Sequence, residues 1–155
     1  MGQKVNPIGL RVGISKTWNS KWYAGKDYPE QLKQDLSIQE FVKKRLKHAA
    51  ISHIEVERTA KKTKVNIFTA RPGIIIGRKG DEVERLKHEL NKLTRHEVIV
   101  NIKEIKRPEI DATLVAENIA NQLERRIAYR RAIRRADLSH ADEHCRLQNH
   151  GWRTS

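Results

Sequence analysis

The sequence predicts an α+β fold in which helices cover one face of a small sheet. Segments with helical spacing of apolar residues alternate with segments in which apolar and polar residues alternate one by one. They follow one another as helix, strand, strand, short helix, helix and strand, before a last long helix. Packing of the apolar stripes on the sheet would close one core, and 155 residues suffice for one such domain with extensions.

A basic arm, residues 1–27, opens the chain and shows no steady period apart from a short predicted strand at Leu10–Ile14. Basic and aromatic side chains alternate along it: Lys4, Arg11, Lys16, Trp18, Lys21, Trp22, Tyr23 and Lys26. Such side chains can stack on bases and pair with a nucleic-acid backbone. They could equally anchor the arm on the protein surface. We name Lys4 and Arg11 as RNA-binding candidates.

The predicted central domain, residues 28–107, begins with a helix over Pro29–Lys47, with Asp27 as its cap and Pro29 in its first turn. Its apolar positions are Leu32, Leu36, Phe41, Val42 and Leu46. Alternating residues then predict a strand over Ser52–Arg58 and another over Val65–Thr69. Residues 59–62 between them are predicted to form a hairpin turn.

The second half of this domain is predicted to contain two helices and a strand. Pro72 can open a very short helix through Ile76, which the segment Gly77–Gly80 ends. Asp81–Leu93 forms the next helix, with one apolar stripe: Val83, Leu86, Leu90 and Leu93. Glu97–Ile105 is rich in residues that favour strands. It has apolar residues at both odd and even positions, as a strand covered on both faces would.

A long helix is predicted over residues 108–136, introduced by Pro108 and Asp111. Its buried stripe would be Val115, Ile119, Leu123 and Ile127. Arginines then replace apolar residues: Arg125, Arg126, Arg130, Arg131, Arg134 and Arg135, with 126, 130 and 134 on one ridge and 131 and 135 on the next. Like charges this dense repel, and guanidinium groups matched to phosphate oxygens would offset that repulsion. The alternative is a solvated basic helix end.

The segment Gly77-Arg78-Lys79-Gly80 is the most informative motif. Glycines let a nucleic-acid backbone approach closely, the two middle residues are cationic, and the following helix offers unpaired N–H groups at its first turn. A KH domain clamps about four nucleotides with such a loop. Two strands before the helix pair, rather than after it, indicate the type II order: helix, strand, strand, helix, helix, strand.

Several side chains around this loop are predicted to bind RNA. Arg71, Arg78 and Lys79 would approach phosphates, and Gly77 and Gly80 would permit the approach. One wall of an apolar groove would come from Ile74, Ile75 and Ile76. Alternatively these isoleucines fill the core and the glycines only make a turn. Asp81 and Glu82 follow directly and weaken the pull of the helix on phosphate, so we expect modest affinity from the loop alone.

Composition favours a polyanionic partner, because the formal net charge is +13. Nucleic acid is favoured over a membrane surface, and no apolar stretch approaches the roughly 18 residues of a membrane span. The single cysteine excludes an internal disulfide. The spacing of His140, His144, Cys145 and His150 superficially resembles a zinc site. Nothing in the sequence around them predicts a packed frame, so we expect no metal, no cofactor and no catalytic residue.

These residues resemble the S-three family of small-subunit ribosomal proteins, bacterial or organellar type. The similarity runs to about Ala136 and is most specific at Met1–Pro7, at Thr69–Gly80 and at Gln122–Arg126, extended by Arg130–Ala132. It implies a type II KH domain in the subunit head, bound to rRNA in the cytoplasm or an organelle. It also implies S-ten, S-fourteen, S-four and S-five as neighbours. In that family the arginines matching Arg130, Arg131 and Arg134 face incoming mRNA at the entry channel.

Residues 137–155 depart from the family pattern, which continues into a second α/β domain. We interpret this tail as a frameshift product or a divergent terminus, and expect it to be disordered, or a frayed helix at best. A free-standing KH-type RNA-binding factor is the alternative function. A metal-dependent enzyme built on the tail would be a third class, but no paired carboxylates or nucleophile–base set support it.

Overall fold

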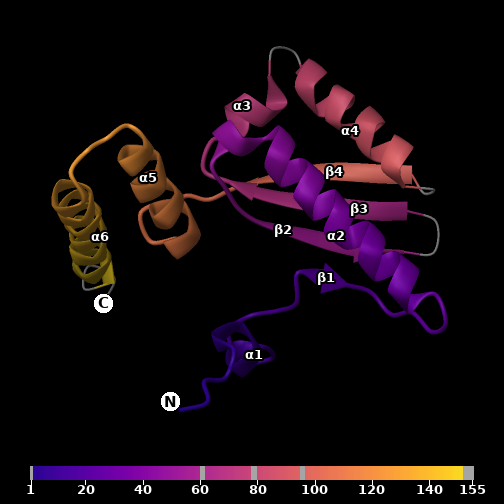
Figure 1. Ribbon diagram of the computed structural model, residues 1–155, viewed down its shortest axis with the longest axis horizontal. Coiled ribbons are helices and arrows are strands. Elements are labelled where there is room, and N and C mark those ends of the chain that lie inside the picture. Colours follow the sequence, from indigo (N-terminus) through magenta and orange to yellow (C-terminus); the bar gives the residue numbers. More distant parts are fainter. Residues whose placement is uncertain (1, 60–61, 78–79, 95–96, 152–155) are drawn as a thin grey trace.

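The computed structural model describes residues 2–59, 62–77, 80–94 and 97–151, with side chains up to residue 141. The order of helices and strands predicted for residues 28–107 is confirmed (Figure 1). The elements are α1 (Pro7–Arg11), β1 (Ser20–Lys21), α2 (Tyr28–Arg45), the 3₁₀ turn η1 (Lys47–Ala49), β2 (Ile51–Arg58), β3 (Lys62–Thr69), α3 (Pro72–Ile76), α4 (Asp81–Leu93), β4 (Glu97–Glu104), α5 (Ala112–Glu124) and α6 (Tyr129–Gly151).

The four strands form one sheet in the order β1-β2-β3-β4. β2 and β3 are antiparallel, and the backbone bonds between Thr59 and Lys62, at 2.9 and 3.3 Å, close the predicted hairpin turn. Residues 60–61 of that turn lie outside the described residues. β4 runs parallel to β3 because the crossover through α3 and α4 returns the chain to the same end of the sheet.

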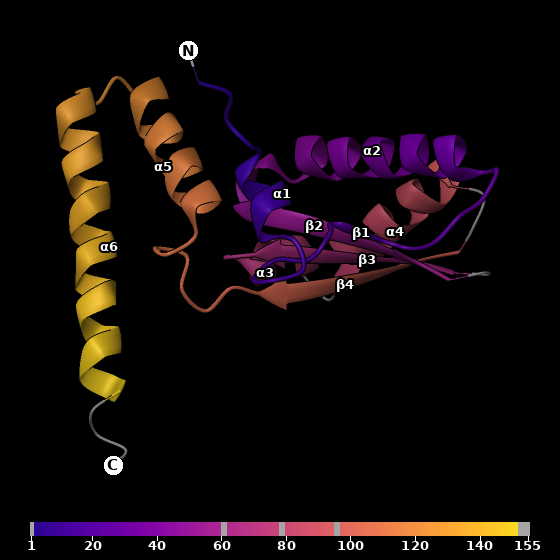
Figure 2. The ribbon, with the colours of Figure 1, turned by 90° about the horizontal axis from the view of Figure 1, so that it is seen from below.

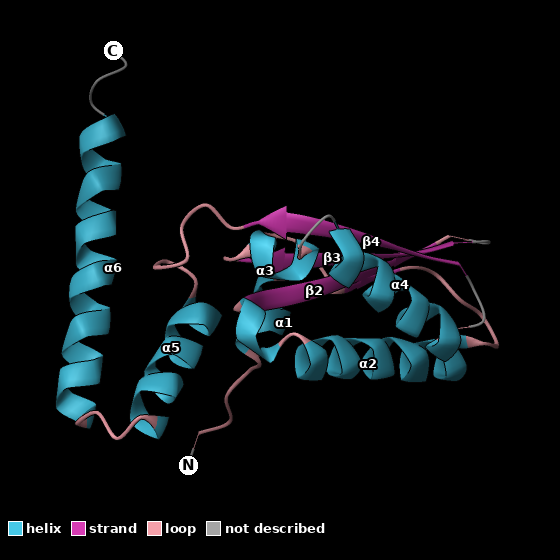
Figure 3. Ribbon diagram, turned by 90° about the horizontal axis from the view of Figure 1, so that it is seen from above, coloured by secondary structure: helices cyan, strands magenta, loops and turns pink. Residues whose placement is uncertain are grey.

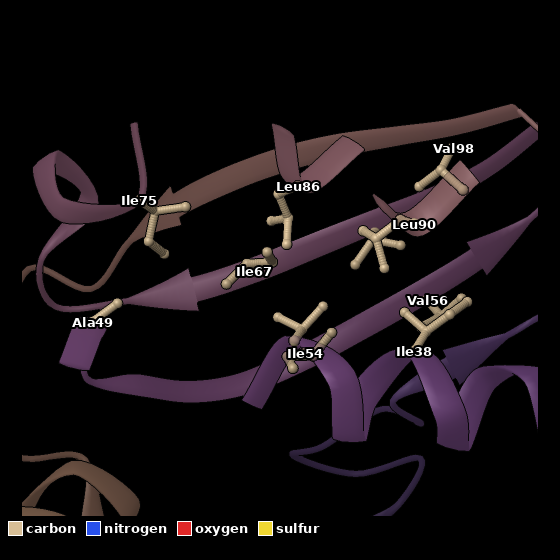
Figure 4. Packing of buried hydrophobic residues seen from close by; sticks show 11 residues of the cluster. Ile38, Ala49, Ile54, Val56, Ile67, Ile75, Leu86, Leu90 and Val98 are labelled. Carbon is tan, nitrogen blue, oxygen red and sulfur yellow. The ribbon is translucent and has the colours of Figure 1, made fainter. Parts of the chain in front are cut away.

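One hydrophobic core lies between the sheet and the helices α2, α3 and α4, which cover the same face (Figures 1 and 2). Strand alternation places one set of side chains in it, since Ile54 faces Ile67 and Val56 faces Val65 across the β2–β3 ladder. Figure 4 shows how the helices complete this core. The buried helical residues are Ile38, Val42, Ile75, Leu86 and Leu90.

The opposite face of the sheet carries polar and aromatic side chains, including those of His53, Phe68 and Lys103. The prediction that β4 is covered on both faces is therefore wrong. Val98 is buried on the core side, whereas Asn101 and Lys103, at positions that face the other side of the sheet, are exposed. β4 is an edge strand, and helices pack on only one of its faces.

Two details of the N-terminal half differ from expectation. Leu10–Ile14 does not form a strand, because Pro7 opens the helix α1 and Asn6 caps it by accepting a bond from the N–H of Ile8 at 2.9 Å. The arm instead contributes the short strand β1, paired with β2. In α2 the buried positions are Asp35, Ile38 and Val42, while Leu36 is exposed.

The predicted helix over residues 108–136 is divided into α5 and α6, which pack side by side as a hairpin (Figure 3). Asp111 caps α5, as expected, by accepting bonds from the N–H groups of Thr113 and Leu114. α5 ends in a Schellman motif: Arg126 has φ +60°, its N–H bonds to Leu123 O, and Ile127 N–H bonds to Gln122 O. Glycine normally takes this left-handed position, so the sequence carried no stop signal.

α6 continues past the arginines with helical backbone as far as Gly151. The sequence predicts disorder or a frayed helix for residues 137–155, whereas the backbone of residues 137–151 is helical; residues 152–155 lie outside the described residues. The hairpin projects from one end of the sheet (Figure 2). Among the described residues, no helix is both long and apolar enough to cross a bilayer.

Candidate nucleic-acid interface

The predicted Gly-x-x-Gly loop connects α3 to α4. Pro72 begins α3, and the N–H of Gly77 closes it with a bond to Gly73 O at 3.0 Å. Gly77 and Gly80 have φ of +68° and +87°, in the left-handed region that glycine enters without strain. Arg78 and Lys79, the cationic pair of the prediction, lie outside the described residues.

The two glycines face different surroundings. A Cβ on Gly77 would lie 2.7 Å from Glu82 Cγ and 3.0 Å from Glu82 Cβ, whereas a Cβ on Gly80 would meet no atom of the described residues within 4 Å. Gly77 is therefore required by the protein's own packing, because the first turn of α4 lies against it. At Gly80 no described atom crowds the position, so its left-handed backbone rather than packing favours glycine there. The sequence pattern alone does not distinguish the two glycines.

The three isoleucines of α3 divide between the two interpretations of the sequence. Ile75 is 1% exposed and belongs to the core, while Ile74 and Ile76 are 48% and 43% exposed. Only these two are therefore available for an apolar groove beside the loop. Arg71 is exposed directly before α3, with its N–H bonded to Thr69 Oγ1 at 3.0 Å.

The start of α4 is acidic: Asp81, Glu82 and Glu84 lie in its first turn and are exposed. They stabilise the positive end of the helix dipole, and for the same reason they compete with an incoming phosphate. Arg85 lies 3.9 Å from Glu82 and compensates part of this charge. These positions support the expectation of modest affinity from the loop alone.

The arginine cluster lies on the hairpin. Arg125 and Arg126 occupy the break between the helices, and the other four arginines lie exposed on α6. The predicted ridge through Arg126, Arg130 and Arg134 is therefore interrupted at its first member, although the spacing of four within α6 remains. Leu123 of the predicted buried stripe is exposed, and Ala132 is buried instead.

Exposed arginines on α6 are free to meet external anions. Within the described part of the chain, none of the six arginines forms an ion pair with a carboxylate. Arg130 folds over its neighbour, with Nε donating to Tyr129 Oη at 3.0 Å and Cζ 5.7 Å from the ring centroid. The helix α6 that carries these arginines lies apart from α3 and α4, which flank the Gly77–Gly80 loop (Figure 3).

The aromatic residues of the arm also divide between the two interpretations. Trp22 anchors the arm, because its Nε1 donates to Asp35 Oδ2 at 2.6 Å and its ring lies 5.3 Å from that of Tyr28. Trp18 and Tyr23 are exposed, as are Lys4 and Arg11. Sequence reasoning missed the role of Asp35, since a single acidic residue in a polar stretch carries no signal of burial.

Among the described residues, no group of three or more histidine, cysteine or acidic side chains is placed to hold a metal ion. His140 is exposed on α6. The side chains of His144, Cys145 and His150 lie outside the described part of the chain.

Comparison with known proteins supports the domain assignment. A family model described as "KH domain" matches residues 37–110, which confirms the KH prediction. The chain is 64% identical over 139 residues to small ribosomal subunit protein uS3 of Geobacter sp. (strain M21), covering 90% of this chain and 66% of that protein. The uS3 proteins of Syntrophus aciditrophicus and Geobacter sulfurreducens are 61% and 58% identical over the same length, with 64% and 66% of those proteins covered. The chain thus spans just under two thirds of the curated relatives it matches.

Proposed function

We propose, since the chain belongs to the uS3 family of small ribosomal subunit proteins, that it is a structural, non-enzymatic constituent of the small ribosomal subunit and binds ribosomal RNA. The observation that carries this proposal is the identity of 64% over 139 residues. That length exceeds the matched KH region of residues 37–110, so the likeness extends well beyond the KH domain.

In this proposal the KH domain (residues 37–110) clamps single-stranded RNA at the Gly77–Gly80 loop. Gly80 lets the phosphodiester backbone come close, Arg78 and Lys79 supply charge, and Arg71 adds a third cation. Ile74 and Ile76 form the apolar side on which bases pack. The acidic first turn of α4 keeps this contact weak, so that it acts together with other contacts.

We further propose that the arginines of the hairpin contact mRNA at the entry channel. Their support is the set of exposed guanidinium groups on α6, without carboxylate partners in the described part of the chain. Guanidinium groups bind phosphate oxygens through paired hydrogen bonds, independently of base sequence. The protein partners in this setting would be S-ten, S-fourteen, S-four and S-five, in the head of a cytoplasmic or organellar small subunit.

Two measurements test the proposal. Tagged chain expressed in a bacterium should co-sediment with small subunits at high Mg²⁺, whereas recovery in the light fractions alone would favour a free-standing KH-type factor. Purified chain held on a filter should retain oligouridylate. It should not retain an oligonucleotide mimic whose backbone is uncharged. If loop and hairpin together neutralise about five phosphates, log K against log salt should have a slope of about −3.5, and a slope near zero would contradict RNA binding through these charges.

A further inference from the structure

The sheet and the hairpin meet at a junction that side-chain packing leaves partly open. A cleft of about 250 Å³ lies there, between Lys43 and Lys47 near the end of α2, Ser52 of β2, and Thr113 and Glu117 of α5. Close-packed surfaces resist relative movement because they interlock, and a cleft of this size reduces that constraint. Apolar packing remains at Leu114 in the first turn of α5, which is buried, and a polar contact supplements it.

A hydrogen bond spans this junction. Ser52 Oγ donates to Asp111 Oδ2 at 2.5 Å, joining the beginning of β2 to the residue that caps α5. The other oxygen, Asp111 Oδ1, accepts from the N–H of Thr113 at 2.9 Å and of Leu114 at 3.2 Å. One carboxylate therefore holds the first turn of α5 with one oxygen and the sheet with the other. Ser52 is 8% exposed, so water competes little for its hydroxyl.

The donor in each hydrogen bond of Ser52 can be assigned, and the assignment shows that the contacts continue into the sheet. A serine hydroxyl has one proton and an ionised carboxylate has none, so the proton between Ser52 and Asp111 comes from Ser52. The 3.0 Å contact between Ser52 Oγ and His53 Nδ1 then requires Nδ1 to be the donor. The His53 ring stacks on Phe68 of β3, with centroids 4.1 Å apart and planes 15° from parallel. The chain of contacts thus runs from β3 to the first turn of α5.

The segment between β4 and α5 has backbone hydrogen bonds of two kinds. Ile105 N–H bonds to Thr69 O at 2.9 Å, which continues the ladder one residue past β4. Beyond it the backbone bonds are those of local turns, from Ile110 to Arg107 O at 3.4 Å and from Asp111 to Pro108 O at 3.3 Å. These turns shape the segment locally, between the last ladder bond of β4 and the cap of α5.

We propose that Ser52 and Asp111 are positioning residues whose hydrogen bond sets the direction of the hairpin relative to the KH domain. The consequence, which rests on the function proposed above, is that the Gly77–Gly80 loop and the arginines of α6 engage one RNA molecule together. When two weak binding surfaces are held at a fixed separation, the second contact forms at high effective concentration. A hairpin that swings freely loses part of that gain.

The structural half is tested by amide residual dipolar couplings on the full chain, which report the relative orientation of two rigid parts. In the wild type, couplings of the sheet and of α5–α6 should fit one alignment tensor. Ser52→Ala removes the bond between Ser52 and Asp111 but leaves the cap of α5 intact. It should reduce the magnitude of the alignment tensor fitted to the hairpin and leave that of the sheet unchanged. Ser52→Thr keeps a hydroxyl at a residue that lines the cleft, so it should restore the common tensor.

Ser37→Ala is the matched control, because it removes a hydroxyl that bonds only Lys33 O on the exposed side of α2. It should leave the common tensor unchanged. Couplings within the sheet of Ser52→Ala should fit the wild-type fold, which separates loss of orientation from loss of folding. A common tensor in Ser52→Ala would overturn the proposal.

RNA binding provides the second readout. Ser52→Ala should bind a long oligouridylate about tenfold more weakly than the wild type, and Ser52→Thr should recover that loss. A short oligouridylate of about five nucleotides, which occupies the KH loop alone, should bind both proteins equally. Equal affinity of wild type and Ser52→Ala for the long RNA would overturn the functional half. If the wild type binds neither RNA, the function proposed above fails, and the dipolar couplings still decide whether Ser52 positions the hairpin.

Discussion

Asp35 and Arg58 form a buried ion pair that joins α2 to the end of β2. Their side chains are 1% and 7% exposed, and Arg58 donates to Asp35 Oδ1 through Nε at 2.8 Å and through Nη2 at 2.5 Å. The second oxygen of Asp35 accepts from Trp22 of the arm. Because each oxygen has a donor, this carboxylate links the helix layer, the sheet and the N-terminal arm.

Asp35→Asn should destabilise the protein strongly, since it leaves the buried Arg58 guanidinium without its counter-charge. Breaking one side of a buried pair costs about 3–5 kcal/mol. Urea unfolding followed by circular dichroism measures the change. Glu40→Gln is the control, because it removes a carboxylate from the exposed pair with Lys44 on the same helix and should shift the midpoint little. Equal shifts in the two variants would contradict the role assigned to Asp35.

Gly77→Ala should be more destabilising than Gly80→Ala. Alanine at 80 would take a left-handed helical backbone, with φ +87° and ψ 2°, at a cost of about 1–2 kcal/mol. Position 77, with φ +68° and ψ −171°, lies in a region that essentially only glycine occupies, which adds to the cost there. Only the alanine at 77 also collides with the side chain of Glu82. Thermal unfolding of the two variants gives the comparison. If alanine at 80 were as harmful as alanine at 77, the assignment of Gly77 to internal packing would be wrong.

The double substitution Arg78→Asp with Lys79→Asp should abolish binding of short single-stranded RNA while the protein stays folded. It reverses charge at the loop, where phosphates would lie. Filter retention measures the binding, and far-UV circular dichroism checks the fold. Lys33→Asp with Lys87→Asp makes the same change of charge at exposed positions on α2 and α4 and should retain most of the affinity. Unchanged affinity in the loop variant would refute the clamp.

Stability should fall as the pH drops below about 6.5, with a contribution from His53. Burial lowers the pKa of His53 from its ordinary value of 6.5, with Glu55 and Asp111 opposing and Lys16 and Lys21 assisting that shift. The unfolded chain therefore takes up the proton at a higher pH than the folded chain. The contribution of His53 to the free energy of unfolding is complete above the ordinary pKa. It is lost as the pH falls toward the lowered pKa of His53 in the folded chain.

The measurement is the free energy of unfolding at about pH 7.5 and about pH 5.5. His53→Gln should lose less stability between the two values than the wild type. His88→Gln, at an exposed position on α4, should follow the wild type. A His53→Gln protein with the full wild-type pH dependence would exclude this histidine as a source.

Arg126→Gly should stabilise the hairpin by about 1 kcal/mol, because glycine occupies the left-handed position at the end of α5 without the strain of a Cβ. Chemical denaturation measures the gain. Arg125→Gly, one residue earlier at φ −79°, is the matched control and should not stabilise. A loss of stability in Arg126→Gly would indicate that the arginine side chain itself holds the break.

Much of the architecture could be predicted because it depends on neighbours in the sequence. The alternation of Ile54 and Val56 with polar residues places the core face of β2, and Pro72 with Gly77 delimits α3. These are properties of backbone geometry and period, which a window of a few residues contains. The loop, the helix pair and the basic character of the last helix followed from the same local rules.

Tertiary structure decided the features that depend on residues distant in the chain. Ser52 and Asp111 are 59 residues apart, and Asp35 and Arg58 are 23 apart, so no local pattern brings them together. The division of α5 from α6 at Arg126 likewise needs the packing of two helices to compensate a strained arginine. Burial is the physical reason in each case. A polar group or an unusual backbone angle becomes favourable only after the fold has removed water and supplied its partner.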